Sequence, residues 1–126
     1  MGRPNRQGDL VIEYIPERGD LIWVDFDPHA GREQAGRRPA VVLSPATYNG
    51  KAGLAIVCPI TSRAKGYPFE VTLSEKHAIN GVILVDHVKS LDWSKRRAEK
   101  AGRLVGPVLQ HVQHTIALLL GIPVPS

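Results

Sequence analysis

The chain contains little cysteine and few aromatic residues. Its 126 residues include one Cys, two Trp, three Tyr and two Phe. A single cysteine, Cys58, excludes an internal disulfide and a zinc site built from several cysteines. Because Cys58 lies in the apolar run LAIVCPI, we expect a buried small side chain rather than a reactive thiol.

Long apolar runs are also absent. No stretch is long enough to cross a bilayer, and the first twenty residues, MGRPNRQGDLVIEYIPERGD, lack the apolar segment of a signal peptide. We therefore expect a cytoplasmic protein that does not interact with membranes. Residues 1–15 are polar with isolated apolar side chains, which predicts a loose N-terminal extension ahead of a single domain at 16–126. With 43% apolar residues, that domain is expected to fold around a modest core.

Charge is unevenly distributed along the chain. Residues 1–30 hold three Arg and six acidic side chains, whereas residues 31–126 hold thirteen Lys or Arg and six acidic side chains. A basic body favours an anionic partner, and nucleic acid is the first candidate. Ordinary solubilising charge explains a balance of this size equally well.

Short apolar runs separated by turn residues predict a β-rich fold. Strands are expected at residues 20–26, 39–44, 54–61, 69–73 and 82–88, with a turn or one helical turn at 45–53. Pro39 is expected to open its strand or to lie on an edge, because it lacks a backbone N–H. Residues 90–103 carry five basic side chains and are interpreted as short helix and loop.

The C-terminal region changes to a helical pattern. From Pro107 the apolar positions 108, 109, 112, 116, 119 and 120 follow one face of a helix, and Gly121 and Pro123 end it. The fold class is therefore mainly β with added α: a small, strongly curved antiparallel β-barrel with short helices and a C-terminal helix.

The loop at residues 27–38 is too long and too charged for a simple hairpin turn. Its sequence, DPHAGREQAGRR, offers the guanidinium groups of Arg32, Arg37 and Arg38, which suit phosphate, and the carboxylate of Glu33. A solvated surface loop with local ion pairs is the competing interpretation.

Two further segments place polar groups at the ends of buried strands. Thr61 ends CPIT directly before the basic segment SRAK, where its hydroxyl could orient a phosphate or could simply cap a turn. VDHVKS brings Asp86 and His87 next to the cation Lys89, either at a site or at an ordinary surface rim. Both tryptophans, Trp23 and Trp93, are expected to be structural.

Taken in order, GDLIWVDFDP, EQAGRRPAVVLSP, CPITS, KGYPFEV and DHVKS resemble the MazF/PemK/Kid family of toxin ribonucleases from bacterial toxin–antitoxin modules, in particular its chromosomal MazF type. The similarity runs from about Arg18 to Gly121. It implies an SH3-like barrel, a homodimer, and an endoribonuclease that cleaves single-stranded RNA at short sequences without a metal or other cofactor. It also implies an antitoxin with a disordered tail, which we expect to be acidic because it faces a basic surface.

The resemblance assigns roles only where the motifs match. Arg38 and Thr61 correspond to the residues usually assigned to catalysis. Glu33 corresponds to the glutamate beside the RNA groove and is our first choice for the base. Asp86 corresponds to an aspartate that is given a catalytic role in plasmid-encoded members, and His87 stands where glutamine is common. The expected RNA-binding side chains are those of Arg32, Arg37, Arg63, Lys65, Tyr67 and Lys89.

The expected chemistry is attack by the RNA 2′-OH on the adjacent phosphorus, leaving 2′,3′-cyclic phosphate and 5′-OH ends. Two alternatives remain open: a toxin of the same fold that poisons DNA gyrase, and a β-barrel that binds nucleic acid without cutting it.

Overall fold

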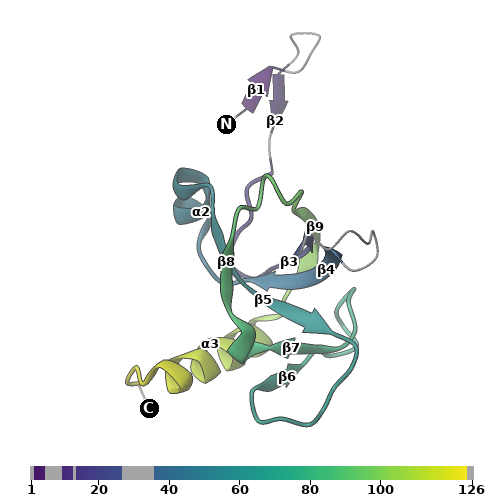
Figure 1. The fold of residues 1–126 in the computed structure, drawn as a ribbon, viewed down its shortest axis with the longest axis vertical. Helices are drawn as coiled ribbons and strands as arrows, with labels where there is room; N and C mark the ends of the chain where they lie inside the picture. Colours follow the sequence, from purple (N-terminus) through teal and green to yellow (C-terminus); the bar gives the residue numbers. More distant parts are fainter. Residues whose placement is uncertain (1, 5–9, 13, 27–35, 125–126) are drawn as a thin grey trace.

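The computed structural model of the protein describes residues 2–4, 10–12, 14–26 and 36–124. Within these ranges, one strongly curved sheet has the strand order β6-β7-β5-β4-β3-β9, and β8 also pairs with β5 (Figure 1). All the pairings in this sheet are antiparallel. Its strands are β3 (Asp20–Asp25), β4 (Arg37–Val42), β5 (Ala55–Thr61), β6 (Glu70–Thr72), β7 (Val82–Leu84), β8 (Lys89–Leu91) and β9 (Glu99–Arg103). The prediction of a mainly β fold is confirmed.

The strand expected at residues 82–88 is interrupted. It ends at Leu84, and a 3₁₀ turn, η1 (Val85–His87), separates β7 from β8. Both β7 and β8 pair with β5, but Ile60 lies opposite Ile83 whereas Val57 lies opposite Lys89. The β7–β8 side therefore holds three more residues than β5 between these two pairs, and η1 takes up the excess.

Two other boundary predictions are wrong. Strand β4 begins at Arg37, so Pro39 lies inside it opposite Trp23, although the ladder to β5 covers only Ala40–Val42 and makes no use of the missing Pro39 N–H. Residues 90–103, interpreted as short helix and loop, contain β8 and β9. Because β9 is an edge strand with largely exposed side chains, it lacks the apolar alternation by which a strand is recognised.

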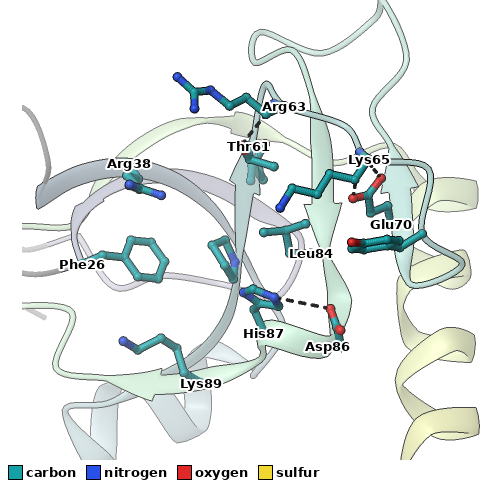
Figure 2. A pocket seen from close by; sticks show the side chains of 13 residues that line it. Phe26, Arg38, Thr61, Arg63, Lys65, Glu70, Leu84, Asp86, His87 and Lys89 are labelled. Atoms are coloured by element: carbon teal, nitrogen blue, oxygen red, sulfur yellow. Dashed lines mark hydrogen bonds and ion pairs between the residues drawn. The ribbon is translucent and has the colours of Figure 1, made fainter.

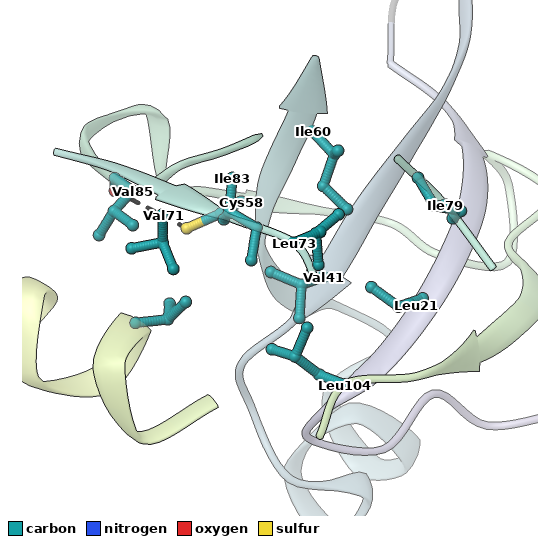
Figure 3. Packing of buried hydrophobic residues seen from close by; sticks show 11 residues of the cluster. Leu21, Val41, Cys58, Ile60, Val71, Leu73, Ile79, Ile83, Val85 and Leu104 are labelled. Atoms are coloured by element: carbon teal, nitrogen blue, oxygen red, sulfur yellow. Dashed lines mark hydrogen bonds between the residues drawn. The ribbon is translucent and has the colours of Figure 1, made fainter. Parts of the chain in front are cut away.

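Both faces of the sheet are buried, in two separate cores. Leu21, Val41 and Cys58 point to one face together with Ile60 and Ile83, and Figure 3 shows how these side chains meet. Ile22, Ala40, Val42 and Val57 point to the other face, where they pack with Leu91 and Trp93. This alternation explains why β5 reads as a continuous apolar run, and it confirms that Cys58 is buried.

Helices close the two cores. The helix α3 (Gly106–Leu120) lies against the first core through Val112 and ends at Gly121, whose φ of 71° is typical of a C-terminal cap. The helix α2 (Ala46–Ala52) lies where a turn or one helical turn was expected at 45–53, and its seven residues make it longer than one turn. Asn49 on α2 is fully buried. Its side-chain NH₂ donates to the backbone carbonyls of Pro16 and Ser44, and its backbone carbonyl accepts a hydrogen bond from the Trp93 indole N–H.

The N-terminal segment, expected to be a loose extension, contains two short strands. The strands β1 (Gly2–Pro4) and β2 (Leu10–Ile12) pair as a separate two-stranded sheet. Tyr14 and Ile15 pack against the second core, and the Tyr14 hydroxyl donates to the buried carboxylate of Asp20. Burial and this carboxylate raise the pKa of Tyr14. No helix in the described part of the chain has the length and apolar character needed to span a membrane.

Candidate active site

An open hollow of about 660 Å³ lies where β4, β5, the segment after β5 and η1 meet (Figure 2). Basic, acidic and aromatic side chains surround it, as expected of a site for a charged polymer with bases. Its lining residues are Phe26, Arg38, Pro59, Ile60, Thr61, Arg63, Lys65, Tyr67, Glu70, Leu84, Asp86, His87 and Lys89.

Arg38 and Thr61 lie on neighbouring strands at one wall of this hollow. The β4–β5 pairing runs through Ala40 opposite Pro59, and each strand continues two residues further, to Arg38 and to Thr61. The Thr61 hydroxyl oxygen accepts the Arg63 N–H at 3.2 Å, which leaves its own O–H proton to donate elsewhere. The turn-capping role and a phosphate-binding role are therefore compatible in this residue.

Gly81 fixes where Thr61 lies. It has a φ of 126°, and a Cβ atom on Gly81 would lie 2.2 Å from the Thr61 carbonyl oxygen. The close approach of the chain at the start of β7 to the end of β5 thus requires glycine. This signal was available in the sequence only as one glycine in a turn.

The 3₁₀ turn η1 presents two titratable groups to the hollow. The Asp86 carboxylate lies 3.8 Å from His87 Nε2, and both side chains are about half exposed. Val85 is fully buried and anchors the turn beneath them. Lys89 follows, with its ammonium 5.3 Å from the centre of the Phe26 ring.

The segment between β5 and β6 supplies the remaining predicted RNA contacts. Arg63, Lys65 and Tyr67 all line the hollow, and the Tyr67 side chain is 60% exposed. Phe26 and Glu70 also line it and were missed by sequence reasoning. Phe26 directly follows β3 and Glu70 begins β6, so neither stands out as part of a polar motif.

Arg37 lies apart from the other predicted RNA contacts. It is not among the residues that line the hollow, and its guanidinium donates to the Asp25 carboxylate at 3.2 Å and to the Glu99 carboxylate at 2.9 Å. Adjacent residues of a strand point to opposite faces, so Arg37 and Arg38 cannot both face the groove. Hydrogen bonds from Arg97 and then from Arg37 lower the pKa of Asp25. The structure therefore places the Arg37 guanidinium in this ion-pair cluster and not at the hollow.

Arg32 and Glu33 lie outside the described residues. Among the residues that are described, no three or more His, Cys, Asp or Glu side chains gather as a potential metal site. Cys58 lies in the first core, where burial raises the pKa of its thiol to about 12. Because a thiolate is the reactive form, we do not assign Cys58 a chemical role.

A second open hollow, also of about 660 Å³, adjoins the first. Arg38, Ile60, Thr61 and Arg63 line both, so these four residues lie between the two hollows. Trp23, expected to be structural, is 40% exposed and lines the second hollow. Trp93 is buried as expected.

Comparison with known proteins places this site in a family. A family model described as "PemK-like, MazF-like toxin of type II toxin-antitoxin system" matches residues 17–120. The chain belongs to this toxin family. The matched residues include all the described residues that line the two hollows.

The similarity extends to characterised relatives. The endoribonuclease toxin MazF of Escherichia coli K12 is 52% identical over 112 residues, which is 89% of this chain and the whole of the relative. The endoribonuclease toxin ChpB of the same organism is 39% identical over 75% of this chain and 84% of its own length.

Solved structures share the fold. The crystal structure of MazF from Deinococcus radiodurans is 55% identical with a TM-score of 0.80, covering 87% of this chain and all of that one. A MazE–MazF crystal structure from the same organism is 53% identical with a TM-score of 0.81, at the same coverage of both chains.

Proposed function

We propose that the hollow lined by Arg38 and Thr61 is the active site of the endoribonuclease activity that this toxin shares with its relatives, and that it cleaves single-stranded RNA at short sequences. The observation that carries the proposal is the pairing of a guanidinium and a hydroxyl at one wall of a hollow that is lined by four Lys or Arg side chains and by the exposed Tyr67. Single-stranded RNA is the substrate that such a surface suits, because its unpaired bases can stack on aromatic rings while its phosphates meet the cations.

The proposed reaction is an intramolecular transesterification. The 2′-oxygen attacks the adjacent phosphorus, the bond from phosphorus to the 5′-oxygen breaks, and the products carry a 2′,3′-cyclic phosphate and a 5′-OH. Negative charge builds up on the phosphorane oxygens. The Arg38 guanidinium stabilises that charge, and the Thr61 O–H donates to a phosphate oxygen and fixes its orientation.

One proton must leave the 2′-OH and one must reach the 5′-oxygen. Arg38 stays protonated in proteins and is a poor base. Glu33 remains our first candidate for the base, since it lies four residues before the start of β4 at Arg37 in the sequence. Asp86 and His87 line the hollow and form the alternative pair, in which the carboxylate accepts a proton and the imidazole relays one.

Binding of the RNA backbone is assigned to Arg63, Lys65 and Lys89, together with Arg32. Tyr67 stacks on a base, and Phe26, held beneath Lys89, offers a second aromatic face. Because phosphate contacts release counterions, affinity falls steeply as salt rises.

A cognate antitoxin is the expected protein partner, since the MazE–MazF structures of Deinococcus radiodurans contain such a complex. We propose that the antitoxin is acidic and competes with RNA for the basic hollow. The chain is also proposed to form a homodimer. The end of α3 supports this, because Leu118, Leu120 and Ile122 are 63%, 65% and 52% exposed. The proposed place of action is the cytoplasm, where mRNA is translated.

The two alternatives make different predictions. A gyrase poison or a non-cutting RNA binder leaves RNA intact. The 52% identity to an endoribonuclease over almost the whole chain favours cutting.

The test is incubation of the pure protein with a pool of long single-stranded RNAs in EDTA, followed by mapping of the cut ends. We expect discrete sites with 2′,3′-cyclic phosphate and 5′-OH ends. A matched RNA with a single 2′-deoxynucleotide on the 5′ side of the cut must resist cleavage. Cleavage of that RNA, or loss of activity in EDTA, would contradict the proposed mechanism.

A further inference from the structure

The Glu70 carboxylate accepts hydrogen bonds from backbone N–H groups in the segment between β5 and β6, which carries several of the proposed RNA contacts. The Lys65 N–H lies 3.1 Å from both oxygens of Glu70, and the Gly66 N–H donates to Glu70 Oε1 at 2.9 Å. The Glu70 N–H in turn donates to the Tyr67 carbonyl at 3.1 Å. Gly66 has a φ of 78°, which turns its N–H and that of Lys65 toward the same point. Figure 2 shows the carboxylate beneath the Lys65 backbone.

The Glu70 carboxylate is not placed there to attract RNA, because its negative charge repels phosphates. Glu70 lines the same hollow as Arg38 and Lys65, so a negative group lies where RNA phosphates are expected. Among the ion pairs of the described residues, none includes Glu70. The carboxylate is therefore satisfied by backbone N–H groups and not by a neighbouring cation.

We propose that Glu70 is a positioning residue, whose carboxylate holds residues 62–69 in the shape that presents Lys65 and Tyr67 to RNA and so helps to select the cleavage sequence. The proposal rests on the proposed function of the hollow. Tyr67 is 60% exposed and has little packing of its own, so the backbone ties on either side of it set where its ring lies. A contact surface ordered before binding loses less entropy when RNA arrives.

Whether substitution of Glu70 weakens or strengthens RNA binding distinguishes a positioning role of the carboxylate from an effect of its charge alone. Glu70→Ala removes both the charge and the backbone bonds, whereas Glu70→Gln removes the charge but keeps an oxygen at Oε1, where both N–H groups already donate. If charge alone mattered, both variants would bind RNA more tightly. Positioning requires Glu70→Ala to bind more weakly and Glu70→Gln to recover most of the loss.

The assay uses the full-length protein and an RNA made uncleavable by a 2′-deoxynucleotide at the mapped cut. We expect Glu70→Ala to weaken binding about tenfold, the scale of one net hydrogen bond to a charged group. On cleavable RNA pools, KM is expected to rise while kcat changes little, and the ranking of cut sites is expected to shift. Glu75→Ala is the matched control, because Glu75 is an exposed acid that does not line the hollow.

Gly66→Ala supplies a second variant that leaves the charge in place. A Cβ atom on Gly66 would meet nothing within 4 Å, but the left-handed backbone strains any other residue. It is expected to weaken binding and to shift cut-site ranking in the same direction as Glu70→Ala. Binding by Glu70→Ala that equals or exceeds that of wild type would overturn the inference while wild-type cleavage still stood. Absence of wild-type cleavage would instead overturn the proposed function.

Discussion

Two adjacent arginines with opposite surroundings offer a direct test of the active site. Arg38 is exposed and lines both hollows, whereas Arg37 points to the other face and donates to Asp25 and Glu99. Arg38→Ala and Arg37→Ala make the same change in composition and in net charge, one residue apart. Any difference between them reports what each guanidinium contacts.

For Arg38→Ala the loss is expected in the chemical step. Removing one preorganised donor from developing negative charge costs about 3–4 kcal/mol, or roughly 10²–10³ in rate. The hollow is open to solvent, so water screens the guanidinium and we expect the lower end, about 100-fold. Stability is expected to change little, since the Arg38 side chain lies in the groove and not in either core.

For Arg37→Ala the loss is expected in stability. The partner Glu99 has a 72% exposed side chain, so that ion pair contributes almost nothing, whereas Asp25 is only 14% exposed. Asp25 keeps Arg97 as a partner, with a nitrogen–oxygen distance of 2.7 Å. We therefore expect a loss of about 1 kcal/mol. For a domain of this size, that corresponds to a fall in Tm of roughly 3–6 °C.

Single-turnover cleavage of one short RNA, measured with thermal unfolding of the same samples, separates these outcomes. The slope of binding against salt adds a third readout, and Arg38→Ala is expected to lower it by about 0.7 for a single strand while Arg37→Ala leaves it unchanged. The reasoning fails if folded Arg38→Ala cleaves within threefold of wild type. It also fails if folded Arg37→Ala loses as much activity as Arg38→Ala.

Three further predictions concern residues that hold the surrounding fold in place: Gly81, Asn49 and Asp25. Gly81→Ala would place a Cβ atom 2.2 Å from the Thr61 carbonyl oxygen and so force the end of β5 to move, and cleavage is expected to fall at least tenfold while circular dichroism keeps its β signature; wild-type activity would contradict the placement. Asn49→Leu removes three buried hydrogen bonds and is expected to cost about 3 kcal/mol in urea unfolding; a cost below about 1 kcal/mol would contradict the network. The pKa of Asp25 is lowered, so its ion pairs contribute fully to stability above about pH 5, and this contribution is lost as pH falls through the lowered pKa. The Tm advantage of wild type over Asp25→Asn should therefore shrink toward pH 3, and a constant advantage would contradict the assignment.

Much of the fold was predictable because buried segments carry a clear pattern. Residues 20–26 and 54–61 are apolar runs between turn residues, and both form strands near the predicted bounds. The spacing from Pro107 correctly predicted α3. Exposed β9 could not be recognised, because its EKAGR sequence is stabilised by pairing with β3 and not by an apolar face of its own.

The candidate site was predicted less completely, because strand periodicity acts on single residues. Arg37 and Arg38 look alike in the sequence, and only the register of β4 against β3 decides which of them faces the hollow. The contribution of Glu70 was invisible for a related reason. Its partners are backbone N–H groups, which no side-chain motif records.

In the turn η1, the backbone pairing determines where a residue lies without requiring a particular amino acid there. Because β5 pairs with both β7 and β8 and the paired segment is three residues longer, residues 85–87 must leave the ladder. The buried Val85 side chain anchors the turn, and its N–H donates to the Phe69 carbonyl at 3.1 Å, so the next two residues project over the hollow. His87 is 59% exposed in its side chain and makes no core contact that a different residue would break. The backbone therefore holds position 87 at the hollow, and we expect that substitutions there can alter base recognition at little cost to the fold.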